Sequence, residues 1–252
     1  MGDLAQDSTA SGRVQFANTH WSVVLMAGQS GSPLCGEALE SLCTSYWPPI
    51  YAFLHRKGYA PADAKDLTQE FFATFLEKDF LSSVNPAKGK FRSFLLASLK
   101  HFLANAWDRA RAEKRGGKYS FVSLDEQTGE GQYNLGTASK ITPEELFDRQ
   151  WALTVFEQTL HRLKSQWEAD GKSARFKELY IYLSSEPVAG AYAGVGARLQ
   201  MSNEAVAAEV HRMRKQFGEL LRKEIGRTVT SPVEIEEEMR FLREVFSKQG
   251  IA

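Results

Sequence analysis

ADAKDLTQEFFATFL, residues 62–76, has apolar side chains spaced for one side of an α-helix. At about 3.6 residues per turn, that side is formed by Leu67, Phe71, Phe75 and Leu76. The opposite side is polar, and its acids are Asp63, Asp66 and Glu70. The apolar side predicts burial in a core. The acidic side is either a solvated face or a surface that docks onto a partner.

Helical spacing extends from this segment in both directions along the chain. Upstream, an apolar series predicts a helix that bends at Pro48–Pro49 and ends at Gly58. Downstream, a helix is expected from about Phe91 to Arg111. Alternating patterns are scarce, and YSFVSL (119–124) is the single short strand candidate. The predicted fold class is therefore all-α.

Composition divides the chain into five segments. Residues 1–15 are polar and are expected to be disordered, and residues 16–118 form a first helical domain. Residues 119–141 are rich in Gly, Ser, Thr, Gln and acids, which is typical of a flexible linker. Residues 142–226 form a second helical domain, and residues 227–252 form a C-terminal helical extension. Two small helical domains joined by a linker are predicted.

The second domain opens on a strong local signal. Thr142, Pro143 and Glu145 make a capping box with proline at the first helical position. The helix that follows is expected to end at Asp170–Gly171. After it come a shorter helix, a helix near 190–199, a long helix over about 203–226, and the amphipathic tail PVEIEEEMRFLREVF. That tail either masks the second domain or extends its core, and the second alternative is favoured.

Charge and targeting signals limit the class of protein. The net charge is zero, which argues against a surface coated in basic residues but allows a local basic patch. Cys35 and Cys43 fit no zinc pattern, and reduced thiols are favoured over a disulfide. The N-terminus lacks the apolar stretch of a signal peptide, and no apolar run approaches the roughly 20 residues of a membrane helix. A cytoplasmic protein without a membrane partner is expected.

Residues 191–225 have the layout of a helix-turn-helix. A short helix ends at Leu199, a turn follows at 200–202, and Ser202 can cap the second helix. The core face of that helix is predicted to carry Val206, Val210, Met213, Phe217 and Leu220. The opposite face is predicted to carry Glu204, Ala208, His211, Arg212 and Lys215. Either this helix enters a DNA major groove, or the pair is a plain helical hairpin with a solvated basic face.

A second cluster, WDRARAEKRGGK (107–118), combines basic residues with preceding aromatic ones. Cations neutralise phosphates, and flat rings receive unstacked bases, so such a cluster suits opened DNA. A basic helix end that complements the helix dipole explains the same pattern. No phosphate loop, paired metal-binding histidines or catalytic triad spacing is evident, so no enzyme activity, metal site or cofactor is expected.

Three motifs in this order resemble a bacterial RNA polymerase sigma factor of the extracytoplasmic-function (ECF) type. They are DAKDLTQEFFATFLEKDFL (63–81), GKFRSFLLASLKHFLANAWDRARAEKR (89–115) and EAVAAEVHRMRKQFGELLRKEI (204–225). The resemblance covers roughly residues 16–226, and the run around residues 46–72 is similar to a planctomycete-like subgroup with a C-terminal extension. It implies a region 2 that binds the polymerase clamp and the promoter −10 element. It also implies a region 4 that binds the polymerase flap and the −35 element.

The resemblance assigns roles to individual residues. Those that would bind polymerase are Asp63, Asp66, Gln69 and Glu70. Those that would contact DNA in the first domain are Phe91, Arg92, Phe94, Arg109, Arg111, Lys114 and Arg115. Those that would contact DNA in the second domain are Ser202, Asn203, His211, Arg212, Arg214 and Lys215. Core RNA polymerase and promoter DNA are the implied partners, with an anti-sigma factor or a regulatory kinase as further candidates.

Several positions depart from the family pattern. Ala207 stands where relatives have Lys, Glu209 adds a negative charge to the recognition helix, and Gln200 replaces the usual turn glycine. Gly194 and Gly196 lie in the predicted helix near 190–199, and each is expected to lower its stability by about 0.5–1 kcal/mol relative to Ala. Two alternatives therefore stay open: a stand-alone helix-turn-helix regulator, and a degenerate sigma-like protein that acts through protein contacts alone. A phosphate on Thr68 would add charge to the acidic face.

Overall fold

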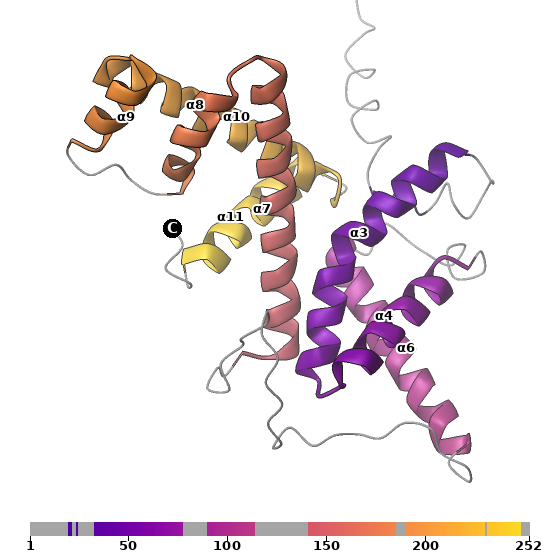
Figure 1. The fold of residues 1–252 in the computed structure, drawn as a ribbon. Coiled ribbons are helices and arrows are strands. Elements are labelled where there is room, and N and C mark those ends of the chain that lie inside the picture. The colour runs from indigo at the N-terminus through magenta and orange to yellow at the C-terminus, as the bar shows by residue number, and fades with distance from the viewer. Residues whose placement is uncertain are drawn as a thin grey trace, which may run out of the picture. The chain divides into compact units, whose positions relative to one another are not determined.

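The structure is a computed structural model, and it describes residues 20–21, 24, 33–77, 90–113, 141–184, 190–229 and 231–247. Every regular element in these ranges is a helix, which confirms the predicted all-α fold class (Figure 1). The expected disorder at 1–15, the strand candidate at 119–124 and nearly all of the proposed linker lie outside the described residues. In the described ranges, no helix is both long and apolar enough to cross a membrane.

The chain forms two compact units. The first contains residues 1–151 with Arg227–Thr230, and the second contains Ala152–Gly226 with Ser231–Ala252. The division between the two units falls inside a helix, α7 (Pro143–Ala169). The domain limits drawn from the sequence stay a prediction, because residues 78–89 and 114–140 are outside the described parts.

The first unit contains α3 (Pro33–Arg56), α4 (Pro61–Phe75) and α6 (Phe91–Glu113). Helix α3 continues through Pro48 and Pro49 and ends at Arg56, and Gly58 closes it as predicted. Gly58 has a φ of 96°, and its N–H donates to the His55 carbonyl at 3.1 Å, while Tyr59 N–H donates to the Leu54 carbonyl at 3.3 Å. This pair of hydrogen bonds is the Schellman motif. The motif needs a residue in the left-handed conformation, which glycine adopts without strain.

Aromatic rings fill the core of the first unit. Phe91 is fully buried, and its ring centroid lies 5.1 Å from that of Trp21 and 5.4 Å from that of Tyr46. Phe71 of α4 contacts Phe102 of α6 with centroids 5.6 Å apart. Such edge-to-face and tilted pairs add about 0.5–1.5 kcal/mol each to area burial. The amphipathic spacing of α4 and α6 is therefore satisfied mainly by aromatic contacts.

The start of α7 belongs to the first unit. Its capping box is formed as predicted: Thr142 N–H donates to Glu145 Oε2 at 2.8 Å, and Glu145 N–H donates to Thr142 Oγ1 at 3.1 Å. Glu144 pairs with Lys100 of α6 at 2.7 Å, and a hydrogen bond from this ammonium lowers the pKa of the Glu144 carboxyl. The Glu144–Lys100 pair attaches the first turn of α7 to α6.

Residues 227–230 also belong to the first unit, although they lie between two helices of the second. The Thr228 carbonyl accepts the N–H of Phe91 at 3.1 Å, and the Arg227 carbonyl accepts the N–H of His20. Thr228 and Val229 are buried. The first of these bonds satisfies an N–H at the start of α6 that no helical partner can accept. Composition alone did not indicate this placement.

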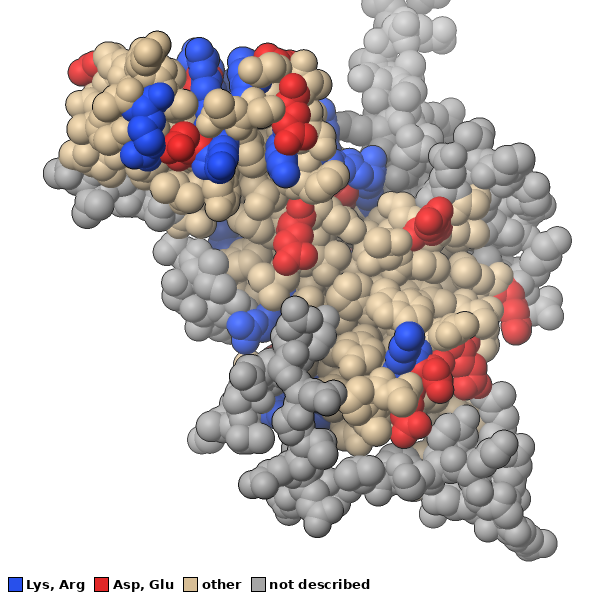
Figure 2. All heavy atoms as spheres, in the orientation of Figure 1, with Lys and Arg blue, Asp and Glu red and all other residues tan. Residues whose placement is uncertain are grey.

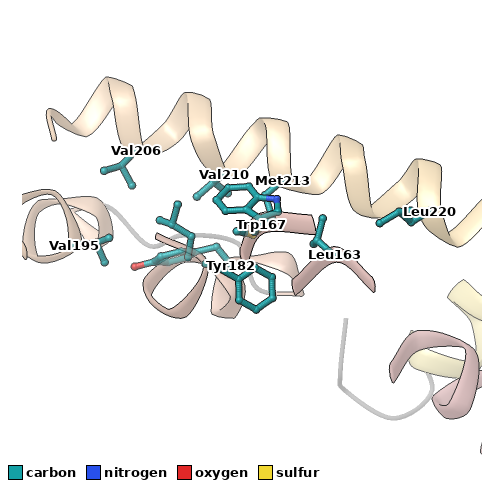
Figure 3. Packing of buried hydrophobic residues seen from close by; sticks show 10 residues of the cluster. Leu163, Trp167, Tyr182, Val195, Val206, Val210, Met213 and Leu220 are labelled. Carbon is teal, nitrogen blue, oxygen red and sulfur yellow. The ribbon is translucent and has the colours of Figure 1, made fainter. Parts of the chain in front are cut away.

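The second unit continues α7 and adds α8 (Ser173–Leu179), η2 (Tyr180–Leu183), α9 (Ala191–Leu199), α10 (Asn203–Gly226) and α11 (Pro232–Ser247). One side of α10 carries Val206, Val210, Met213 and Leu220 into a core with Leu163, Trp167, Tyr182 and Val195 (Figure 3). Trp167 Nε1–H donates to Gln216 Oε1 at 2.9 Å, so the one polar group of this buried indole has a hydrogen-bond acceptor.

Helix α11 extends the core of the second unit, which was the favoured alternative for the tail. Phe156 of α7 lies between Phe217 of α10 and Phe246 of α11, with ring centroids at 5.0 and 5.4 Å. At the surface, Arg222 of α10 pairs with Glu236 of α11 at 3.2 Å. These contacts pack α11 against α7 and α10 within the unit itself.

Candidate nucleic-acid and protein-binding surfaces

Helices α9 and α10 are joined by a tight turn at residues 200–202. Gln200 has a φ of 53°, and it is the single non-glycine residue with positive φ among the described parts of the chain. The N–H of Met201 donates to the Gly196 carbonyl at 2.9 Å. A Cβ on Gly196 would lie 2.6 Å from the Met201 carbonyl oxygen. The backbone of the turn therefore packs directly against α9 at Gly196, where a side chain would clash with the Met201 carbonyl.

The first turn of α10 is capped as predicted. The N–H of Ala205 donates to Ser202 Oγ at 3.2 Å. Glu204 also stands in this turn, and hydrogen bonds from its own backbone N–H and from Ser202 lower the pKa of its carboxyl. Ser202, Asn203 and Glu204 are all exposed. The N-terminus of α10 thus exposes hydroxyl, amide and carboxylate groups to solvent.

The rest of α10 has the two faces that its spacing predicts. Val206 and Met213 are fully buried, and Val210 and Leu220 are nearly so. The exposed side carries Glu204, Ala208, His211, Arg212 and Lys215. Arg214, which the resemblance assigned to DNA, makes a contact within the unit: its Nε–H donates to the Tyr182 carbonyl of η2 at 2.9 Å. Arg214 therefore joins α10 to η2, and its assignment to DNA stays a prediction.

Glu209 corrects an expectation about this helix. Its carboxylate was expected to place a negative charge near the DNA face, but the residue is 4% exposed. It pairs with Arg175 of α8 at 3.3 Å and with Arg212 one turn along α10. A buried carboxylate requires such partners, because an unpaired charge in this setting is costly. Its charge is therefore compensated within the unit and does not face outward.

The acidic side of α4 is exposed as the spacing predicts. Asp66, Gln69 and Glu70 are exposed, and Asp63 is half-buried. Figure 2 shows Asp and Glu side chains grouped on the part of the surface that includes α4. The buried side is wider than predicted, since it consists of Ala64, Leu67, Thr68, Phe71, Phe72 and Phe75. Leu76 follows the last turn and is half-buried.

Thr68 is fully buried, and this removes the basis for a phosphate on the acidic face. Its hydroxyl donates to the Ala64 carbonyl at 2.6 Å. A threonine in a helix commonly makes this bond to the preceding turn. A kinase would have to unfold α4 to reach the hydroxyl. Thr68 is therefore a core residue of the first unit.

Three α6 residues assigned to DNA have structural roles here. Phe91 is fully buried, so its ring is inaccessible to a base in this structure. Arg92 is 9% exposed, pairs with Asp148 of α7, and lies 5.0 Å from the ring centroid of Trp151. Phe94 is half-buried, with its ring centroid 5.0 Å from that of Trp21. The resemblance assigned these residues to DNA, whereas the structure places them in or against the core of the first unit.

The basic end of α6 is described in part. Trp107 is 45% exposed, near the end of the helix. Arg109 and Arg111 lie on α6, but the structure describes only their backbone. Lys114 and Arg115 lie outside the described residues. Their assignment to DNA stays a prediction.

Arg175 is the residue that sequence reasoning missed. It lies on α8, in the segment SARFKEL, which showed no DNA-binding motif. Its contact with Glu209 joins residues 34 positions apart, so no local spacing could indicate it. Figure 2 shows Lys and Arg side chains interspersed with acids over the helices of the second unit. The candidate surface of this unit is thus mixed in charge and not uniformly basic.

Comparisons with protein-family models, with curated proteins and with solved structures find no match to this chain.

Proposed function

We propose that this chain is a promoter-specificity subunit of bacterial RNA polymerase, a sigma factor of the ECF type. It would bind core polymerase and direct it to promoters through contacts with the −10 and −35 elements. The observation that carries the proposal is the α9–turn–α10 pair, whose second helix has a capped, exposed leading end. Its support is the exposed acidic side of α4, which precedes it in the chain.

Helix α10 would occupy the major groove of the −35 element. In a helix-turn-helix, residues at the start of the second helix reach base edges, and basic residues further along contact phosphates. Ser202 and Asn203 are exposed at the start, and His211 and Lys215 are exposed further along. Burial of Glu209 supports this role, because it keeps a carboxylate away from phosphates. Ala207 still lacks the phosphate contact that lysine would make.

Helix α4 would dock onto the polymerase clamp. Its exposed polar groups are Asp66, Gln69 and Glu70, and its other side is anchored in an aromatic core. Charged groups on a rigid helix favour a partner of opposite charge and fix the orientation of binding. The basic end of α6, with Arg109 and Arg111, would lie near −10 DNA. The chain would act in the cytoplasm and contribute no catalytic residue.

The direct test is run-off transcription with the purified chain and core polymerase from the same bacterium. Promoter fragments from that genome are expected to support initiation when the chain is present. Core polymerase alone is the control and is expected to give no specific transcript. If no fragment yields a transcript that depends on the chain, the proposal fails.

A charge reversal on α4 separates this function from a stand-alone helix-turn-helix regulator. The double change Asp66→Lys and Glu70→Lys is expected to weaken core binding at least about tenfold, since like charges at an interface are strongly unfavourable. Glu40→Lys is the matched control, because Glu40 is an exposed acid of the same unit outside α4. A regulator that works without polymerase would retain its DNA binding and show no core binding to lose.

A further inference from the structure

Glu209, Arg175 and Arg212 form a compact charged group on the second unit. The carboxylate of Glu209 pairs with Arg175 at 3.3 Å through Oε1, and with Arg212 through Oε2. Each carboxylate oxygen is thus engaged by a different arginine. Two guanidinium charges against one carboxylate leave the group with one positive charge. The acid on the recognition helix therefore belongs to a cationic group.

The three side chains differ sharply in exposure. The Glu209 side chain is 5% exposed, while those of Arg175 and Arg212 are 46% and 64% exposed. A guanidinium carries five N–H donors in a planar fork. Glu209 contacts one nitrogen of each arginine in this structure, so the carboxylate lies beneath and the outer parts of both forks face solvent. The group is anchored inside and presents donors outside.

This arrangement suits an anionic oxygen ligand of fixed geometry. A guanidinium fork matches a phosphate with paired N–H bonds, which a lysine ammonium cannot do. Ordering a long side chain on binding normally opposes affinity, and a side chain already held in place avoids much of that cost. The pair with Glu209 holds both arginines before any ligand arrives. Their exposed donors are therefore pre-organised for a phosphate.

We propose that Arg175 and Arg212, held from beneath by Glu209, bind a phosphodiester group of duplex DNA. This inference rests on the proposed DNA-binding function of the second unit and extends its surface from α10 to α8. Arg175 becomes a DNA-contacting residue, and Glu209 becomes a positioning residue. The site compensates in part for the phosphate contact that Ala207 cannot make.

Salt dependence of DNA binding tests the site. The full chain is titrated into a labelled mixed-sequence duplex over a series of potassium chloride concentrations, with fluorescence anisotropy as the readout. The slope of log K against log salt reports the number of phosphates that the protein neutralises. Arg175→Gln and Arg212→Gln are each expected to make this slope shallower by about one unit. Arg175→Lys keeps the charge and is expected to keep the wild-type slope.

Arg222→Gln is the matched control. Arg222 lies on the same helix as Arg212, pairs with Glu236 at 3.2 Å, and has a side chain that is 51% exposed. The control removes the same charge and a comparable ion pair, and its slope is expected to equal that of the wild type. Thermal unfolding of each variant confirms that it is folded. Arg212→Gln, which alters the more exposed arginine, supplies the measurement if Arg175→Gln unfolds.

The outcomes separate the site from the proposed function. If wild-type protein binds the duplex and both glutamine variants keep its slope, the site is refuted and DNA binding stands. An equal change in Arg222→Gln also refutes it, because the effect would then be one of net charge. If the wild-type chain binds no duplex even at the lowest salt, DNA binding by this unit fails, and the site fails with it.

Discussion

Two glycines of α9 are expected to respond in opposite directions to the same substitution. A Cβ on Gly194 meets only a terminal nitrogen of Arg198, at 3.6 Å, which is ordinary contact with a flexible group. Gly194→Ala should therefore gain helix propensity of about 0.5–1 kcal/mol. A Cβ on Gly196 would lie 2.6 Å from the Met201 backbone oxygen, so the turn must move. Overpacking of this kind costs about 1–3 kcal/mol.

The net expectation for Gly196→Ala is a loss of about 1–2 kcal/mol, because its propensity gain offsets part of the overpacking cost. The unfolding free energy of the second unit should therefore be roughly 2 kcal/mol lower in Gly196→Ala than in Gly194→Ala. Hydrogen exchange of amides in α9 and α10 reports the local unfolding free energy, while urea denaturation reports the whole chain. Equal or greater protection in Gly196→Ala than in Gly194→Ala would refute the reasoning, since it would mean that the turn does not close on α9.

Three further predictions concern a turn, a cap and a buried imidazole. Gln200→Gly should stabilise the second unit by about 0.5–1 kcal/mol in urea denaturation, because a left-handed conformation costs a residue with a Cβ about 1–2 kcal/mol and glycine's greater unfolded-state entropy offsets part of the gain. Thr142→Ala should destabilise the first unit by about 1 kcal/mol, since it removes the hydroxyl that accepts the Glu145 N–H in the capping box. Burial, with a smaller contribution from Arg227, lowers the pKa of His20 to about 3. Stability measured by thermal unfolding should therefore fall as pH drops below about 6.5, by about 1–2 kcal/mol at pH 5, and continue to fall toward pH 3.

The sign for His20 follows from which state takes the proton first. The unfolded imidazole is protonated below about pH 6.5, whereas the folded one resists protonation until about pH 3. Protons therefore bind preferentially to the unfolded chain in this window, and folding weakens as pH falls. His20→Gln is the control, because it should lose this part of the pH dependence. Identical pH profiles for wild type and His20→Gln would contradict the assignment to His20. Unchanged stability of Thr142→Ala would contradict the cap prediction, and a loss of stability in Gln200→Gly would contradict the turn prediction.

Local signals predicted much of the helical framework. Thr142, Pro143 and Glu145 lie within four consecutive residues, so the start of α7 could be inferred without knowledge of the rest of the chain. Ser202 and the spacing from Val206 to Leu220 predicted α10 and its buried side in the same way. A cap or an amphipathic face depends on neighbours one to four positions away, and sequence order alone supplies these.

The environment of individual polar residues followed from tertiary contacts instead. Glu209 was expected to add a negative charge to the recognition helix, but it is buried and is paired with Arg175 from 34 positions away. Arg92 was assigned to DNA, but Asp148 meets it from 56 positions away. Thr68 was placed on the acidic face, although the core extends over it. In each case burial depends on what packs against the helix, which spacing within the helix does not reveal.

The sequence by itself determined the all-α class, most helix limits, the exposed acidic side of α4 and the two faces of α10. These depend on backbone propensity, capping and helical period, which are properties of short segments. Tertiary structure alone decided that a Cβ at position 196 would crowd the turn, that the Thr228 carbonyl caps α6, and that Glu209 is buried. These depend on which segments meet in space, because burial and ion pairing are properties of contacts and not of residue type.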